Sequence, residues 1–421
     1  MPRRSLTSIG FADLRLAVVS PFVDRRHGTE RCIAEQLERF AKQPDAEIHL
    51  YSQRVVDLSN VVCYPAGPAG CIVWHRVLRL RGPHLFGYIW WVLANHLQRW
   101  WDTKIRGLKF DLLYTPGINA FDADAISIHV VFAEFYRRVR PRLRLGDASI
   151  FLWPVILHRR LYYRLICLLE RRIYPRKRTA LTGISRHTAD CARDSFQRDD
   201  VMVIRYGVDT KTFHPRVRLE RRQSARNLFG ILPAHFCLLL IGNDWKSKGL
   251  DALLRALSDC PEIAFRLLVV GTDDPRGHAE VIRNLRLDSQ VRLLGPSPDV
   301  LQFYSAADAY VGPSLEDAYG LPILEAMACG LPIIASMRAG VSEIVRHGEN
   351  GLILRDPEDS RELASLLRKL YSDAALREKL TEEAARSAGR ETWDRNAADT
   401  WEFLKAAHAK KTRTEAGPIT T

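Results

Sequence analysis

The sequence predicts a two-domain α/β protein whose parallel sheets are covered by helices on both faces. Its 421 residues exceed the length over which a single hydrophobic core usually grows. Its apolar runs are short and continuous rather than alternating, as expected for strands that are buried on both faces. Stretches with helical periodicity separate these runs, and such an alternation is typical of doubly wound domains.

The alternation is clearest in the second half of the chain, where we expect a domain over residues 216–390. Short apolar runs, several of which end in Gly or Pro, predict its strands at 236–242, 265–271, 291–295, 309–313, 331–336 and 351–354. Helical periodicity predicts helices between these strands, at 250–257, 300–307 and 362–370.

The first half repeats this pattern less regularly, and we expect a domain over residues 1–215. A first helix is predicted at 28–41, and the strands are predicted at 14–20, 47–52, 111–115, 125–129, 179–185 and 201–206. The polar stretch 209–226 is the expected join between the domains. Residues 391–421 are expected to form a C-terminal helix and then, from about Lys410, a disordered tail.

Positive charge is concentrated in the first half. The whole chain has a formal net charge of +13, and residues 1–215 alone hold 34 basic against 20 acidic side chains. We therefore expect the first half to meet an anionic partner, which is a nucleic acid, a membrane surface or a phosphate-bearing substrate.

Two insertions in the first half combine this charge with aromatic side chains. Residues 72–101 contain five tryptophans among arginines, and residues 137–178 contain 13 basic residues but only two acidic ones. Rings at headgroup depth and cations on anionic lipid are typical of segments that lie at a membrane interface. We expect an anionic membrane surface as a partner. The alternatives are helices with an ordinary solvated basic face and a nucleic-acid surface.

The cysteine spacing indicates a reducing compartment. None of the eight cysteines is spaced C-x-x-C, so neither a disulfide framework nor a zinc module is expected. No run of apolar residues is long enough to predict a transmembrane helix, and the N-terminus lacks the apolar segment of a signal peptide. We expect a cytoplasmic protein that is peripheral on the inner face of the cell membrane.

The densest chemical signal lies between residues 313 and 339. Glu325 is the one charged residue from 318 to 337, and a carboxylate among apolar residues needs partners, such as a ribose diol. Its helix is predicted to begin near Gly320, after a strand, so that the first amides face the crevice where α/β folds favour phosphate. In the structural alternative, Asp317 is a helix N-cap and Glu325 pairs with a protein donor.

Three shorter segments suit an anionic ligand. Lys246 and Lys248 precede a predicted helix, where cations oppose the helix dipole unless an anion lies between them and the amides. Gly28 follows the first strand, where a glycine lets the backbone approach a phosphate. His129 ends a predicted strand. The alternatives are that Lys246 and Lys248 lie in a solvated loop and that His129 is a structural histidine. Neither G-x-G-x-x-G nor a P-loop occurs, so a dinucleotide enzyme and an NTPase lack support.

Together these segments resemble the retaining glycosyltransferases of family 4, most clearly over residues 230–350. The stretch D-A-Y-G-L-P-I-L-E is similar to the family's E-x7-E motif, with Asp317 and Glu325 at the acidic positions. The order of elements resembles lipopolysaccharide-core and O-antigen transferases. Further similarity lies at 243–249, 271–272 and 340–345, and in the first half at Gly28, His129 and 207–209.

The resemblance implies a GT-B fold, with two Rossmann-like doubly wound domains that face a central cleft. It implies a nucleotide-sugar donor and no metal or other cofactor, because protein cations take the electrostatic role of a metal. The catalytic residues that it implies are Asp317 and His129, at the donor sugar, and Lys248, at the leaving diphosphate. The donor-binding residues that it implies are Gly28, Lys246, Lys248, Gly320, Leu321 and, at the ribose, Glu325.

The expected function is therefore sugar transfer, with retention of configuration, from a nucleotide-diphosphate sugar. The acceptor is expected to be lipid-linked, or a lipopolysaccharide or exopolysaccharide saccharide, with no nucleic-acid partner. The alternatives are a soluble, glycogen-synthase-like transferase and a non-catalytic basic protein that binds nucleic acid. An inactive homologue is a further alternative, because Asp317 stands where the family has Glu.

Overall fold

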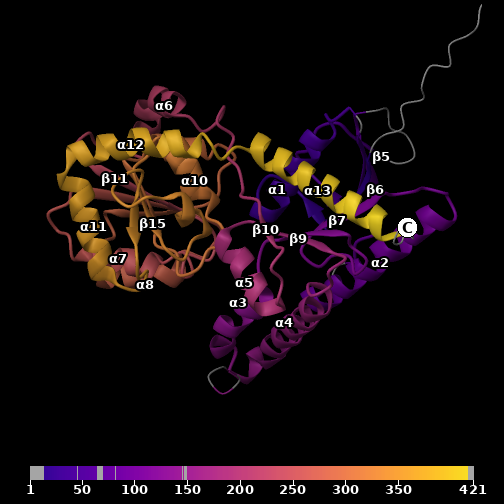
Figure 1. Ribbon diagram of the computed structural model, residues 1–421. Coiled ribbons are helices and arrows are strands. Elements are labelled where there is room, and N and C mark those ends of the chain that lie inside the picture. Colours follow the sequence, from indigo (N-terminus) through magenta and orange to yellow (C-terminus); the bar gives the residue numbers. More distant parts are fainter. Residues whose placement is uncertain are drawn as a thin grey trace, which may run out of the picture. The chain divides into compact units, whose positions relative to one another are not determined.

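The computed structural model describes residues 14–44, 46–63, 70–80, 82–144, 146 and 149–415. The chain divides into two compact units (Figure 1). The first comprises Met1–Ile204 and Asn396–Thr421, and the second comprises Arg205–Arg395. Each unit contains one large parallel sheet flanked by helices, so the predicted α/β class is confirmed.

The first unit is built on a parallel sheet of eight strands. They are β1 (Leu14–Val19), β3 (Ala46–Ser52), β5 (Val61–Cys63), β6 (Ile72–Arg76), β7 (Leu112–Pro116), β8 (Ala125–Ile128), β9 (Ala180–Gly183) and β10 (Met202–Val203). The strand order is β10-β9-β8-β7-β1-β3-β6-β5. A separate parallel pair is formed by β2 (Phe22–Val23) and β4 (Arg54–Val55). The sequence predicted neither this pair nor β5 and β6.

The helices of the first unit follow the predicted alternation and the two insertions. They are α1 (Gly28–Phe40), α2 (His84–Lys104), α3 (Phe132–Val139), α4 (Trp153–Ile173) and α5 (Arg186–Phe196), with the short 3₁₀ helices η1 (Arg140–Leu143) and η2 (Ile150–Leu152). The first insertion thus forms β6 and most of α2. The second insertion extends from the end of α3 to beyond α4. Figure 1 shows α2 and α4 as two long helices side by side.

Strand β1 illustrates why its sheet needs cover on both faces. Successive strand residues point to opposite faces, and Leu16 and Val18 belong to one buried cluster while Ala17 and Val19 belong to another. The first cluster includes residues of α1, and the second includes Trp91 of α2. The continuous apolar run therefore reflects burial on both sides, as predicted.

The second unit is a doubly wound domain with six parallel strands. They are β11 (Phe236–Ile241), β12 (Phe265–Val270), β13 (Val291–Leu294), β14 (Ala309–Gly312), β15 (Ile333–Ser336) and β16 (Leu352–Leu354), in the order β13-β12-β11-β14-β15-β16. Its helices are α6 (Pro215–Leu228), α7 (Leu250–Ser258), α8 (Arg276–Asn284), α9 (Leu301–Ala306), α10 (Leu321–Ala328), α11 (Ser360–Ser372) and α12 (Ala374–Ala388), with η3 (Gly340–Ile344). All six predicted strands are found.

The units divide between residues 204 and 205, whereas the sequence predicted a boundary after residue 215. The amide of Ile204 still donates to Gly183 in the first sheet. Arg205 already pairs with Glu343, and the Tyr319 hydroxyl donates to the carbonyl of Tyr206. The expected join at 209–226 therefore lies inside the second unit, where its second half forms α6.

The C-terminal helix is longer than predicted. Helix α13 (Trp393–Glu415) continues past Lys410, where the sequence predicted a disordered tail to begin. Trp401 and Leu404 are buried in the core of the first unit, and Lys411 binds the carbonyl of Asp111 and the carboxylate of Asp124, both at 3.0 Å. These contacts explain why the helix continues. Residues 416–421 lie outside the described residues.

Among the helices that the structure describes, none combines the length and the apolar content needed to cross a bilayer.

Candidate active site

The second sheet reverses its strand order between β11 and β14. The chain proceeds outward from β11 to β12 and β13, and then returns to place β14 on the other side of β11. Open α/β sheets bind ligands at such a switch point, outside the carboxyl ends of the strands. The two loops that leave this point are residues 242–249, after β11, and residues 313–320, after β14.

The two loops are held together by a hydrogen bond and an ion pair. The amide of Leu315 donates to the carbonyl of Ser247 at 2.8 Å. The ammonium of Lys248 lies 2.5 Å from the Oδ2 atom of Asp317, and both side chains are mostly buried. The structure thus brings together two residues that the resemblance placed in the catalytic machinery, although 68 residues separate them in the chain.

A glycine allows this close approach. Gly249 adopts a positive φ of 78°, which side chains rarely tolerate. A Cβ atom at this position would lie 2.0 Å from the carbonyl oxygen of Pro313. The loop after β11 can therefore rest against the end of β14 only because residue 249 has no side chain.

Helix α10 begins beside this ion pair. Its N-cap is Gly320, with a φ of 92°, and no side chain caps its first amides. Asp317 is therefore not the N-cap that the structural alternative proposed, and its Oδ1 atom accepts from the amide of Tyr319 instead. Leu321 is the first helical residue. An uncapped helix N-terminus favours an anion, both through its donors and through the helix dipole.

Glu325 lies one turn further along α10 and is 5% exposed. Its Oε2 atom accepts a hydrogen bond of 2.7 Å from the hydroxyl of Tyr304, which lies on α9. Burial and the neighbouring carboxylate hold the pKa of Tyr304 well above its usual range, so this hydroxyl remains a donor. Glu325 thus has the protein donor that the structural alternative expected. The sequence did not identify Tyr304 as this donor, because helical periodicity predicts its burial but not its partner.

The loop after β11 is also tied to the loop after β12. The side-chain oxygen of Asn243 accepts from the amide of Thr272 at 3.0 Å, and Asp273 accepts from the amide of Trp245. Trp245 itself is fully buried. Lys246, in contrast, is exposed, so of the two predicted lysines only Lys248 is held against the loop after β14.

Gly28 and His129 belong to the first unit. Gly28 is the exposed first residue of α1, after the turn in which Asp24 accepts from the amides of Arg26 and His27. His129 follows β8 and is 6% exposed, and burial lowers its pKa to about 3. The ring is therefore neutral at physiological pH, where it can form hydrogen bonds but supplies no positive charge.

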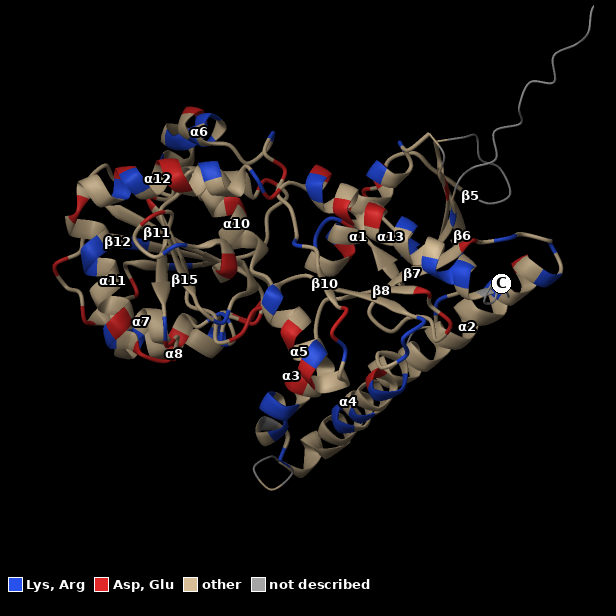
Figure 2. Ribbon diagram, viewed as in Figure 1, with Lys and Arg blue, Asp and Glu red and all other residues tan. Residues whose placement is uncertain are grey.

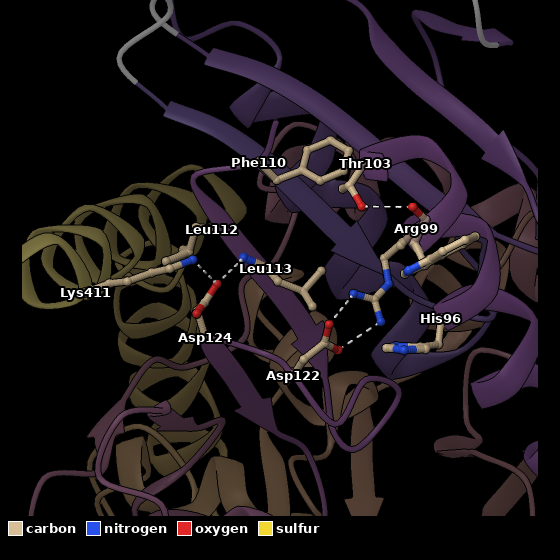
Figure 3. A pocket seen from close by; sticks show the side chains of 10 residues that line it. His96, Arg99, Thr103, Phe110, Leu112, Leu113, Asp122, Asp124 and Lys411 are labelled. Carbon is tan, nitrogen blue, oxygen red and sulfur yellow. Dashed lines mark hydrogen bonds and ion pairs between the residues drawn. The ribbon is translucent and has the colours of Figure 1, made fainter. Parts of the chain in front are cut away.

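A cavity of about 280 Å³ lies elsewhere in the first unit, beside the start of β7 (Figure 3). Arg99 forms a bidentate pair with Asp122, at 2.8 and 2.9 Å, and Lys411 pairs with Asp124. The lining cations shown in Figure 3 thus already have carboxylate partners. The cavity also lies at the amino end of β7, away from the end where such sheets bind ligands.

Comparison with known proteins gives a family match within the second unit. Residues 229–387 match the family model described as Glycosyl transferases group 1. The matched segment begins just after α6 and ends in α12, and it contains both loops and all of α10. The resemblance found in the sequence is therefore matched over residues 229–387, at the level of the group 1 glycosyl transferases.

Among curated proteins, a D-inositol 3-phosphate glycosyltransferase of Pseudarthrobacter chlorophenolicus is 32% identical over 212 residues. The match covers 48% of this chain and 49% of that protein, so the chain spans about half the length of the curated relatives it matches.

Solved structures extend the likeness to the whole fold. WaaG, a glycosyltransferase involved in lipopolysaccharide biosynthesis, superposes with a TM-score of 0.71 at 18% identity, over 92% of this chain and 99% of WaaG. Anabaena HepE, solved in complex with UDP-glucose, gives a TM-score of 0.64 at 18% identity, over 93% of this chain and all of HepE. The chain has the GT-B fold, as predicted.

Proposed function

We propose that this protein is a glycosyltransferase that moves a hexosyl group from a nucleotide-diphosphate sugar to a saccharide acceptor. The observation that carries the proposal is the cluster at the switch point of the second unit, where Lys248, Asp317 and the uncapped N-terminus of α10 converge. The segment that contains the cluster matches the group 1 glycosyl transferases. HepE, which shares the fold, was solved with UDP-glucose bound.

The leaving nucleoside diphosphate determines the roles of the second unit. Lys248 neutralises the charge that develops as the sugar departs, and the amides of Gly320 and Leu321 donate to the sugar and its phosphates. Lys246 assists from the exposed side of the loop. Asp317 neutralises Lys248 before the donor binds, and it accepts from the donor sugar's hydroxyls afterwards. Glu325, oriented by Tyr304, accepts from the ribose hydroxyls.

The first unit supplies the remaining groups in this proposal. The backbone at Gly28 approaches the β-phosphate, and the neutral ring of His129 donates or accepts a hydrogen bond at the sugar. Transfer proceeds with retention of configuration, through attack on the face that the diphosphate leaves. No metal is needed, because protein cations and amides stabilise the leaving group.

The proposed acceptor is a lipid-linked saccharide or a lipopolysaccharide or exopolysaccharide intermediate, met at the cytoplasmic face of a membrane. WaaG, with the same fold, is described as acting in lipopolysaccharide biosynthesis. The excess of basic residues in the first half of the chain is compatible with an acceptor that carries phosphate or lies on anionic lipid.

A thermal-shift panel of nucleoside diphosphates and their sugars tests the donor proposal. We expect one nucleoside diphosphate to stabilise the wild type, by about 2.7 kcal/mol at one hundred times its Kd. Glu325→Ala should lose this shift, because the ribose loses its acceptor. The matched control Glu349→Ala removes an exposed carboxylate of the same unit and should keep the shift. A panel without any shift in the wild type, together with no release of nucleoside diphosphate from any sugar donor, contradicts the proposal.

A further inference from the structure

Helix α2 has a buried face and, opposite to it, an apolar face that is exposed. One face is buried in the first unit and includes Trp91, Val92 and Asp102. The opposite face is exposed to solvent over most of the helix, and its residues follow one another at intervals of three or four, as one stripe of a helix does. The stripe consists of Phe86 (65% exposed), Ile89 (41%), Leu93 (54%), Leu97 (62%) and Trp100 (49%).

Helix α4 extends this apolar surface. It lies beside α2 (Figure 1), where the amide of Leu85 donates to His158 and the rings of Tyr88 and Tyr162 are in contact. These two contacts advance together along both helices, so the helices run parallel. The exposed apolar residues of η2 and α4 are Ile150 (72%), Phe151 (91%), Leu152 (53%), Trp153 (42%), Val155 (50%), Leu157 (51%), Leu161 (46%) and Leu168 (48%).

The exposed charge of these helices has one sign. The acidic residues of α2, η2 and α4 are Asp102 and Glu170, and both are 0% exposed. Asp102 accepts from Tyr51 and Arg106, and Glu170 accepts from the first amides of α3. The exposed basic residues of these helices are Lys104 of α2 and Arg159, Arg164, Arg171 and Arg172 of α4. Figure 2 shows basic residues along α4.

We propose that α2, η2 and α4 form a surface that lies flat on an anionic lipid bilayer, with the apolar stripe in the interface and the arginines on the headgroups. Exposed leucines and tryptophans with cations and no exposed acid are the composition of an interfacial helix. The charge is complementary to anionic lipid. A second copy of this surface would oppose arginine to arginine, and a nucleic acid offers nothing apolar to the leucines. The inference deepens the proposed function, since it defines where a lipid-borne acceptor is met.

Co-flotation with vesicles tests this surface. Wild type should float with vesicles of mixed phosphatidylcholine and phosphatidylglycerol, and much less with phosphatidylcholine alone. Leu93→Glu combined with Leu97→Glu, and separately Arg164→Glu combined with Arg171→Glu, should each lower partitioning about tenfold or more. The matched control is Leu219→Glu with Leu228→Glu, which changes two exposed leucines of α6 in the second unit and should float as wild type does.

Three results overturn the proposal. The first is wild type that stays unbound by the mixed vesicles, and the second is variants that float as wild type does. The third is a self-associated wild type that Leu93→Glu with Leu97→Glu makes monomeric, without any flotation, because the surface then belongs to a second copy. The nucleotide-induced thermal shift is measured without lipid and reports the second unit, so failure of the donor proposal remains distinguishable from failure of this one.

Discussion

Replacing Lys248 by alanine is expected to lower the turnover of sugar transfer by about 10²–10³-fold. Of the two lysines in the loop after β11, Lys248 is the one that the structure holds against the loop after β14. Its ammonium lies 2.5 Å from the carboxylate of Asp317. Without it, the departing diphosphate loses its positive partner while the carboxylate of Asp317 remains beside it. Release of nucleoside diphosphate, measured at saturating donor, gives kcat directly.

Three comparisons make this result specific. Lys369→Ala, an exposed lysine of α11, should retain wild-type turnover. Lys246→Ala should have a smaller effect than Lys248→Ala, because Lys246 is exposed and more distant from the ion pair. The melting temperature of Lys248→Ala should fall, because the mostly buried carboxylate of Asp317 loses its partner, so turnover is compared well below the onset of unfolding. Unchanged kcat in Lys248→Ala would remove the lysine from the proposed chemistry.

Gly249→Ala is expected to destabilise the second unit and to abolish nucleotide binding. A left-handed backbone conformation costs a residue with a side chain about 1–2 kcal/mol. The added methyl group would also lie 2.0 Å from the carbonyl oxygen of Pro313, and a backbone atom cannot rotate away. The loop must therefore leave β14, which separates Lys248 from Asp317.

Denaturant unfolding and the thermal-shift panel check this expectation. Gly277→Ala is the matched control, because this glycine of α8 has open space around its Cβ position. It should be neutral or stabilising by up to about 1 kcal/mol, since alanine favours a helix more than glycine does. If Gly249→Ala unfolds with the wild-type free energy and still binds the nucleotide, the close approach of the two loops is unimportant.

The sequence predicted the second unit well because its signals are local. Continuous apolar runs gave the six strands, and the carboxyl ends of neighbouring parallel strands meet at one edge of a sheet. The family resemblance placed Lys248 and Asp317 in the same site, because the sequence alone does not show that β11 and β14 are neighbours in the sheet. The family resemblance added the roles of the residues, which no spacing could provide.

Features that depend on distant partners were not predictable. Nothing near Tyr304 in the sequence marks it as the donor to Glu325, because the pairing arises from how α9 packs against α10. The tail after Lys410 is as polar as a disordered segment, yet Lys411 finds Asp111 and Asp124 far away in the chain. The aromatic content of α2 indicated an interface, but tryptophans lie on both its buried and its exposed face, so the composition does not reveal which face is solvated.

We propose that Lys248 binds the diphosphate of the donor, and isothermal titration with the nucleoside diphosphate and its parent nucleoside tests this role most directly. For Lys248→Ala, the loss of a charge-assisted hydrogen bond predicts about 10–100-fold weaker diphosphate binding and an unchanged nucleoside Kd. Glu325→Ala should weaken both ligands, since both carry the ribose. Equal diphosphate affinity in wild type and Lys248→Ala would contradict the account.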